Sequence, residues 1–274
     1  MRAKRSLGQN FLVDPNLQRK IVEALDPAPD GTIVEIGPGR GALTRHLVER
    51  VGRLVAVELD DDLAAELSAR YADRRHVEVV HQDILQWDPA AVVDARTRVV
   101  GNIPYNISTP IIFRLLEWRP APERIIIMVQ KEVADRLAAP PGDRQYGALS
   151  VGVQAMADVE RLFTVSRSAF RPVPNVESAV VRIDPGAGID ADVAGRLRAL
   201  TRAAFGLRRK QMQKVLRTAA PYGLDRDTAL DVLGEVGLRP EDRPEVLAPG
   251  QFVALAEALH RRGYPRQDGD ARDG

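Results

Sequence analysis

The sequence predicts an α/β protein in which a mostly parallel, seven-stranded sheet ends in an antiparallel hairpin and is followed by a small all-helical domain. From residue 32 to residue 129, short apolar segments alternate with amphipathic segments of helical period, which is typical of a parallel sheet covered on both faces. Two β-rich segments, 159–165 and 179–183, flank a turn with Pro172 and Pro174, which predicts the hairpin. Beyond a Pro/Gly-containing linker at 184–188, the chain is helical and basic.

The elements follow in order. Asp14 is a favourable N-cap and Pro15 a favourable first residue for a helix that carries Leu17, Ile21 and Leu25 on one face. The five strands expected in the sheet before the hairpin are residues 33–36, 54–57, 77–80, 98–100 and 124–129. Three helices are expected between these strands. Their apolar positions are Leu43, Leu47, Val48 and Val51 in the first, Leu63, Leu67 and Tyr71 in the second, and Ile111, Ile112, Leu115 and Leu116 in the third. The third helix is expected to begin with Ser108 or Thr109 as its cap. A further helix is expected near residues 149–155.

Composition excludes several classes of protein. The 274 residues are 45% hydrophobic and 28% charged, as in globular chains of one or two domains. The absence of cysteine excludes disulfides, thiol nucleophiles and cysteine-ligated metals, and the four histidines have no ligand-like spacing, so we expect no metal site. The apolar run Ile125–Val129 is far shorter than the roughly 20 residues of a membrane span, and the basic N-terminus lacks the apolar core of a signal peptide. We therefore expect a cytoplasmic protein with no membrane partner.

Positive charge is concentrated in two regions although the net charge is only +1. The segment 196–217 contains eight Arg and Lys residues and no acid, and the N-terminus carries Arg2, Lys4 and Arg5. Runs of charge often belong to solvated helix faces, but patches without acids attract polyanions.

A glycine-rich turn, Glu35-Ile-Gly37-Pro-Gly39-Arg-Gly41, lies between the first strand of the sheet and the next helix. Open α/β folds bind nucleotides at this edge, where glycines let the backbone approach a ligand. Glu58 and Asp83 close the next two strands, placed to meet a ribose and an adenine amino group. The turn is neither the Gly-x-Gly-x-x-Gly of dinucleotide sites nor a phosphate loop, although a dinucleotide such as NAD remains an alternative. It resembles the S-adenosylmethionine (SAM) site of class I methyltransferases, whose Rossmann-like fold the sheet matches.

The segment Asn102-Ile103-Pro104-Tyr105, at the end of the fourth strand, resembles the Asn-Leu/Pro-Pro-Tyr motif of methyltransferases that act on adenine amino groups. The Asn102 side-chain oxygen and a backbone carbonyl at Ile103 or Pro104 could accept the two amino hydrogens and direct the nitrogen lone pair toward a methyl donor. Tyr105 is expected to stack on an extruded base. Phe170, in the proline-rich stretch 170–178, is expected to cover the opposite face of that base.

Together, six motifs in chain order resemble the ribosomal RNA adenine N6-dimethyltransferase family, most closely the KsgA type that acts on 16S rRNA. The motifs are residues 6–12, 35–41, 102–105, 130–134, 146–150 and 170–178, and Ile103 departs from the usual Leu. The resemblance implies SAM-dependent dimethylation of two adjacent adenosines in the 3′-terminal hairpin of 16S rRNA, within a pre-30S particle. We also expect the protein to be a monomer.

Residue roles follow from the motifs and the resemblance. The expected catalytic residues are Asn102, Ile103, Pro104, Tyr105 and Phe170, and the expected cofactor-binding residues are Asn10, Leu12, Gly37, Gly39, Glu58, Leu59, Asp83, Ile84 and Asn102. The expected RNA-binding residues are Arg2, Lys4, Arg5, Arg208, Arg209, Lys210 and Lys214. We expect residues 1–185 to form the catalytic domain, with a basic arm at 1–13. Residues 186–264 are expected to form a helical, RNA-binding domain, and residues 265–274 a disordered tail.

Three alternatives remain at this point. The first is a related enzyme that dimethylates one adenine of 23S rRNA and confers antibiotic resistance. The second is a ribosome-assembly or transcription factor that binds nucleic acid without methylating it. The third is an NAD-dependent oxidoreductase, although this sequence offers no evident acid–base histidine for such an enzyme.

Overall fold

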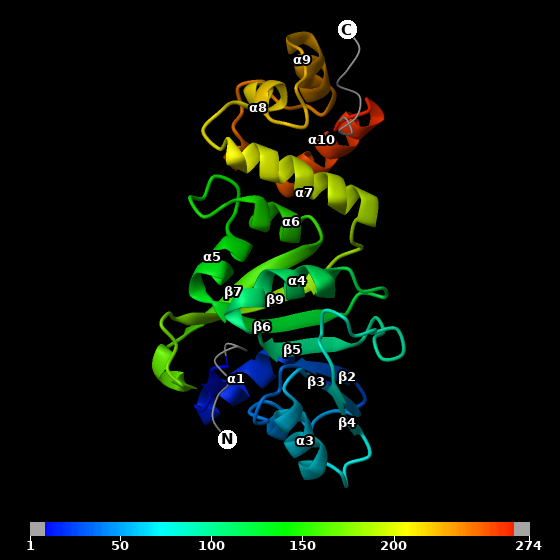
Figure 1. Cartoon of the computed structure of the whole chain (residues 1–274), viewed down its shortest axis with the longest axis vertical. Helices are drawn as coiled ribbons and strands as arrows, with labels where there is room; N and C mark the ends of the chain where they lie inside the picture. Colours follow the sequence, from blue (N-terminus) through cyan, green and yellow to red (C-terminus); the bar gives the residue numbers. More distant parts are fainter. Residues whose placement is uncertain (1–8, 266–274) are drawn as a thin grey trace. The chain divides into compact units, whose positions relative to one another are not determined.

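The computed structural model describes residues 9–265, which form two compact units (Figure 1). The first unit contains the described residues up to Asp135 together with Ala157–Ala187, and the second contains Arg136–Met156 and the described residues from Gly188 onward. The boundary predicted at residue 185 therefore misses the segment Arg136–Met156, which belongs with the helical unit because its side chains enter that unit's core.

The first unit is built on a seven-stranded sheet with the order β4-β3-β2-β5-β6-β9-β7. Its strands are β2 (Thr32–Ile36), β3 (Arg53–Glu58), β4 (Val77–His81), β5 (Arg98–Asn102), β6 (Arg124–Gln130), β7 (Ala157–Val165) and β9 (Ser178–Pro185). The first five strands pair in parallel, whereas β9 pairs antiparallel with both β6 and β7. The predicted fold class is confirmed.

Both faces of the sheet are covered. Consecutive residues of a strand point to opposite faces, yet Ile33–Ile36 and Leu54–Val57 are buried without a break. One face packs against helix α1 (Pro15–Leu25). As predicted, the Asp14 side chain caps α1, where it accepts hydrogen bonds from the amides of Asn16 and Leu17.

The helices between the strands differ from expectation in two places. The helix after the glycine turn, α2, spans only Thr44–Leu47, while α3 (Asp61–Arg70) has the expected length. Helix α4 (Ser108–Leu116) continues directly from a 3₁₀ turn at Tyr105–Ile107, so Ser108 is not a capping residue; its hydroxyl donates to the Tyr105 carbonyl. Helix α5 spans Lys131–Ala138.

A second, two-stranded sheet, which the sequence pattern did not predict, joins the N-terminal segment to the proline-rich stretch. Strand β1 (Phe11–Leu12) pairs antiparallel with β8 (Phe170–Arg171), which follows a 3₁₀ turn at Arg167–Ala169. Two-residue strands carry too little periodicity to be recognised from sequence.

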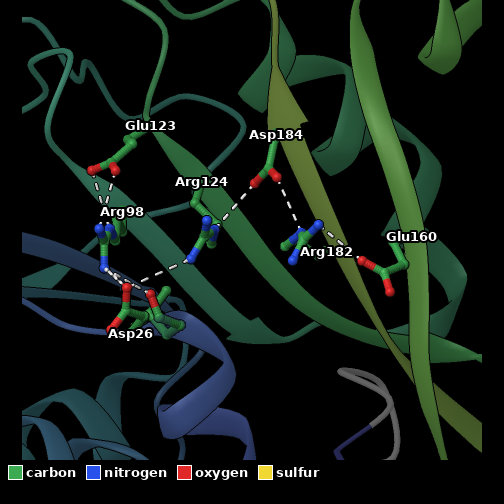
Figure 2. Close-up of polar contacts among 8 residues, drawn as sticks. Asp26, Arg98, Glu123, Arg124, Glu160, Arg182 and Asp184 are labelled. Carbon is green, nitrogen blue, oxygen red and sulfur yellow. Dashed lines mark hydrogen bonds and ion pairs between the residues drawn. The ribbon is translucent and has the colours of Figure 1, made fainter.

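The amino ends of the parallel strands carry a network of ion pairs (Figure 2). Arg98 contacts Glu123 at 3.0 Å and Asp26 at 3.4 Å, and Arg124 contacts Asp184 at 3.2 Å. The guanidinium of Arg98 lowers the pKa of Glu123. Arg182 continues the network from Asp184 to Glu160. These contacts connect β5, β6, β9 and β7 at the edge opposite the carboxyl ends of the parallel strands.

The second unit is helical. It contains α6 (Ala148–Gln154), α7 (Ala191–Gly206), α8 (Met212–Thr218), α9 (Arg226–Glu235) and α10 (Pro249–Arg261), with a 3₁₀ turn at Pro244–Val246. Its core includes Tyr146, whose hydroxyl donates to the Leu247 carbonyl at 2.8 Å. No helix in residues 9–265 combines the length and apolarity that a membrane span needs.

Gly101 sets how closely β5 approaches β2. A Cβ at this position would lie 2.8 Å from the Ile36 carbonyl oxygen, a backbone atom that cannot move aside. We expect Gly101→Ala to lower the free energy of unfolding of this unit by about 1–3 kcal/mol. Both tryptophans of the chain, Trp87 and Trp118, belong to this unit, so the fluorescence midpoint in denaturant reports on it.

Gly195→Ala is the control, because Gly195 lies in α7 and its Cβ would meet no atom within 4 Å. Since α7 belongs to the second unit, which has no tryptophan among the described residues, this variant is followed by circular dichroism. Alanine favours helix over glycine, so this substitution is expected not to destabilise the protein. Equal midpoints for Gly101→Ala and the parent would contradict the packing argument.

Candidate active site

A cavity of about 600 Å³ opens at the carboxyl ends of β2, β3 and β5. With the exception of Phe170, every residue predicted to be catalytic or cofactor-binding lines it: Asn10, Leu12, Gly37, Gly39, Glu58, Leu59, Asp83, Ile84, Asn102, Ile103, Pro104 and Tyr105. The parallel topology brings together those that follow strands of the large sheet, because strands that run in the same direction end at one edge. Asn10 and Leu12 come instead from the N-terminal segment that contains β1.

The glycine turn forms one wall of the cavity with left-handed backbone. Gly37 and Gly39 have φ of 60° and 58°, a region that residues with a Cβ rarely adopt. The Gly37 amide donates to the Val57 carbonyl at 2.9 Å, and a Cβ on Gly39 would lie 3.2 Å from the Phe11 ring. Glycine is thus required here by conformation and, at Gly39, also by space.

Glu58 anchors the next wall. Its Oε2 accepts from the Gly39 amide and its Oε1 from the Asp60 amide, both at 2.9 Å, so the carboxylate ties the glycine turn to the start of α3. Burial raises the pKa of Glu58. Each carboxylate oxygen retains a further lone pair, so the group can still accept hydroxyl donors from the cavity.

The adjoining wall is apolar, with one acid. Leu59 leaves 46% of its surface exposed although it is a large hydrophobic residue, and Ile84 lies in the same lining. The carboxylate of Asp83 accepts from the Leu85 amide at 2.9 Å, which holds it at the end of β4. A flat apolar ligand with a polar edge fits this arrangement.

Glu35, on β2 beneath the glycine turn, is a carboxyl group with almost no exposure to solvent. The Thr44 hydroxyl donates to its Oε2 at 2.7 Å, but burial dominates and raises the pKa of Glu35 to about 7. This group therefore changes charge near neutral pH.

The Asn102 side chain is oriented by the N-terminal segment. Its Nδ2 donates to the Asn10 backbone carbonyl at 2.8 Å. Because a carbonyl can only accept, this contact determines which end of the amide is the NH₂ group. The Oδ1 of Asn102 is therefore left as the acceptor at the cavity.

Tyr105 is held by strand β9. Its hydroxyl and the hydroxyl of buried Ser178 are 2.5 Å apart, and burial raises the pKa of Tyr105, so the phenol stays neutral. The preceding residue, Pro104, uses its carbonyl to accept from the Ile107 amide at 3.2 Å. Ile103 is buried, with its amide donating to the Met128 carbonyl at 3.1 Å.

The prediction that Phe170 covers one face of the target base is wrong in this structure. Its side chain is completely buried, in the core cluster that contains Leu12, Ile21 and Val180, and it does not line the cavity. The pairing of β8 with β1 turns the side chain inward, and the neighbouring Arg171 lines the cavity in its place.

Sequence reasoning missed the groups that hold the N-terminal segment in place. Gln18 is fully buried in α1 and donates to the Leu12 carbonyl at 2.9 Å, while Gln9 donates to the Asp60 carboxylate at 2.9 Å. The available signal for Gln18 was its place on the apolar face of α1, one turn before Ile21 and Val22. Ser178 offered no comparable signal, because its partner Tyr105 is distant in the sequence.

The helical unit carries a basic hollow of about 430 Å³ around the start of α8. It is lined by Arg209, Lys210, Gln211, Gln213, Lys214, Arg217 and Arg243. Arg208 does not belong to it, because its guanidinium pairs with Glu245 at 2.8 Å and donates to the Asp143 carbonyl. The other predicted RNA-binding residues, Arg2, Lys4 and Arg5, lie outside the described residues.

Within residues 9–265, the three acids Asp60, Asp61 and Asp62 bring carboxylate oxygens within 4.8 Å of one another. Asp60 already accepts from the amides of Asp62 and Leu63 as the cap of α3. This cluster is explained by helix capping.

The family model for ribosomal RNA adenine dimethylase matches residues 1–244. The chain belongs to this family. The dimethylase is 42% identical over 269 residues to the Ribosomal RNA small subunit methyltransferase A of Geobacter metallireducens, covering 96% of this chain and 98% of the relative.

Two solved structures have the same architecture as this dimethylase. A dimethyladenosine transferase from Plasmodium falciparum superposes with a TM-score of 0.77 at 26% identity, covering 92% of this chain and 98% of that one. The 23S rRNA methyltransferase ErmE superposes with a TM-score of 0.69 at 28% identity, covering 92% of this chain and all of the other.

The cofactor of this dimethylase is SAM, and the cavity fits it. SAM carries a positive charge on its sulfonium group and has no phosphate. Both properties suit a glycine turn bordered by the carboxyl groups of Glu35, Glu58 and Asp83. The exposed Leu59 provides apolar surface for a nucleobase.

The raised pKa of Glu35 predicts a pH-dependent stability. The unfolded carboxyl ionises above pH 4.5, whereas the folded one keeps its proton until about pH 7. The stabilisation is therefore complete below pH 4.5 and is lost as the pH rises through 7. We expect the parent to lose about 2.5 kcal/mol of unfolding free energy between pH 5 and 8.5 relative to Glu35→Gln, measured by denaturant titration.

Glu49→Gln serves as the control, because Glu49 forms an exposed ion pair with Arg74. An exposed ion pair contributes at most about 1 kcal/mol, so the free energy of unfolding of this variant should stay close to that of the parent. A pH-independent difference between Glu35→Gln and the parent would show that Glu35 is ionised throughout.

Proposed function

We propose that this dimethylase adds two methyl groups to the N6 of each of two adjacent adenosines in the 3′-terminal hairpin of 16S rRNA, within a pre-30S particle. The observation that carries the proposal is the Asn102 amide, whose NH₂ is bound by Asn10 while its oxygen is left at a cavity that Tyr105 also lines. The name of the small-subunit relative supports 16S rRNA as the target. On this proposal the protein acts in the cytoplasm, as a monomer.

In this proposal the cofactor lies along the strand ends. Glu58 accepts the ribose hydroxyls and Asp83 accepts the adenine amino group, with Leu59 and Ile84 against the adenine faces. Asn10, Leu12, Gly37 and Gly39 line the remainder, toward the methionine part. Bound SAM supplies an electrophilic methyl group.

Asn102 and Ile103 prepare the nucleophile. The lone pair of an adenine amino group is delocalised into the ring, so the nitrogen is a poor nucleophile. The Oδ1 of Asn102 accepts one amino hydrogen and a backbone carbonyl accepts the other, which localises the lone pair on nitrogen. Of the two candidate carbonyls we assign Ile103, because that of Pro104 already accepts from the Ile107 amide.

Tyr105 positions the base, and no side chain is asked to remove a proton. The phenol ring stacks on the extruded adenine while Ser178 fixes its hydroxyl. An amide cannot serve as a base near neutral pH, but the methylated amine is cationic and acidic, so water takes its proton afterwards. The rate enhancement then comes from alignment of two reactants.

The basic hollow supplies RNA affinity. Five exposed cations, Arg209, Lys210, Lys214, Arg217 and Arg243, surround it, and Lys210 and Lys214 make no ion pair with any residue between 9 and 265. Unpaired cations release counterions when phosphates bind. We assign Arg209, Lys210 and Lys214 to RNA contact, together with Arg2, Lys4 and Arg5 of the N-terminus.

The 23S-specific alternative is less well supported. ErmE shares the fold and 28% identity, whereas the small-subunit relative shares 42% over nearly the whole of both chains. An NAD-dependent oxidoreductase is excluded by the family match.

We expect Asn102→Ala to lower the single-turnover rate of methyl transfer by a factor of about 100 or more, because an acceptor that acts on the reacting nitrogen is lost. Cofactor affinity, measured by calorimetry, should change far less than this rate. Tyr105→Phe is the matched variant: it keeps the stacking ring and loses only the Ser178 contact, so most of the rate should remain. An unchanged rate in folded Asn102→Ala would end the proposal.

We expect the double change Lys210→Gln and Lys214→Gln to weaken binding to pre-30S particles and to flatten its dependence on salt. Loss of two phosphate contacts should reduce the slope of log K against log salt by about 1.5. Arg226→Gln is the control, since Arg226 is exposed in the same unit but outside the hollow. A slope equal to that of the parent would mean that these lysines are merely solvated.

A further inference from the structure

Exposed large hydrophobic side chains are few in residues 9–265. They are Val13, Leu59, Val173, Val176 and Val246. Leu59 is explained by the cofactor cavity. Val173 and Val176 are 54% and 43% exposed, within a loop of six residues, 172–177, that has no assigned role.

Each end of this loop is connected to one of the proposed catalytic side chains. At the first end, Arg171 lies opposite Phe11 in the two-stranded sheet. Phe11 follows Asn10, and the carbonyl of Asn10 accepts the hydrogen bond from the Asn102 side chain. At the other end, Ser178 contacts the Tyr105 hydroxyl. Arg171 lines the cavity together with Asn102 and Tyr105, so the loop begins directly after a residue of that cavity and ends at the residue that contacts Tyr105.

The loop has a fixed shape. Pro174 between the two valines is buried, Arg167 donates to the Asn175 carbonyl at 3.2 Å, and the Lys131 amide donates to the Glu177 carbonyl at 2.9 Å. Both valines therefore project from an anchored backbone, and their exposure is a property of the loop conformation.

We propose that Val173 and Val176 form an apolar shelf that receives the nucleobase adjacent to the target adenosine. This inference rests on the proposed function. Extruding one adenosine from a stack exposes a face of its neighbour to water, and an aliphatic surface beside the target pocket covers that face. The two guanidinium groups of Arg167 and Arg171, against the single acid Glu177, suit the phosphates on either side of the base.

The occupant of the shelf is the second adenine of the adjacent pair. While one adenine is in the pocket, the other lies next to it along the strand and must stand outside the pocket. The shelf keeps this neighbour unstacked and at the rim between successive transfers.

The test uses two particles assembled on 16S rRNA whose 3′ segment is synthetic and joined by ligation. One carries both adenosines, and the other has an abasic nucleotide in place of the neighbour. For the parent enzyme, we expect the single-turnover rate of methylation of the remaining adenosine to be about tenfold lower on the abasic particle. The V173S/V176S variant should show about this lower rate on both particles, with no further loss on the abasic one.

V246S is the matched control, because Val246 is 51% exposed but lies in the helical unit. It should retain the parent's tenfold ratio between the two particles. A tenfold ratio retained by V173S/V176S would overturn the shelf, as would a parent enzyme that does not distinguish the particles. Absence of methylation of the complete particle by the parent would instead contradict the proposed function itself.

Discussion

The site depends on one hydrogen bond, from the Asn102 side-chain nitrogen to the Asn10 carbonyl at 2.8 Å. It joins residues that are 92 positions apart in the sequence and determines which end of the amide acts as the acceptor at the cavity. The bond is partly shielded from solvent, and loss of either partner would leave the other without this contact. The proposed polarisation of an adenine amino group needs this orientation.

Much of the surrounding structure holds the Asn10 carbonyl where it is. Gln18 binds the Leu12 carbonyl from α1, Gln9 reaches Asp60 at the start of α3, and the pairing of β1 with β8 adds backbone hydrogen bonds. Asp60 is in turn bonded through its amide to Glu58. The acid proposed to bind the ribose and the amide proposed to bind the target base are thus connected through the N-terminal segment.

The two ends of the parallel strands carry opposite kinds of chemistry. The amino ends hold ion pairs around Arg98 and Arg124, in which the charges of both guanidinium groups are balanced by neighbouring carboxylates. The carboxyl ends instead place buried carboxyl groups and left-handed glycines around an open space. Buried acids there keep unusual pKa values, because desolvation outweighs their hydrogen bonds.

The sequence by itself determined the parallel sheet, the hairpin, the helix at Pro15 and the set of residues at the strand ends. These depend on local periodicity and on a topology that sends parallel strands to one edge. Only the tertiary structure decided the inward position of Phe170, the ion pair that keeps Arg208 out of the basic hollow, and the assignment of residues 136–156 to the helical unit. Each of these depends on a partner far away in the chain: β1 for Phe170, Glu245 for Arg208 and the helical core for residues 136–156. The residue pattern of one segment does not indicate which distant residues it will contact in the folded protein.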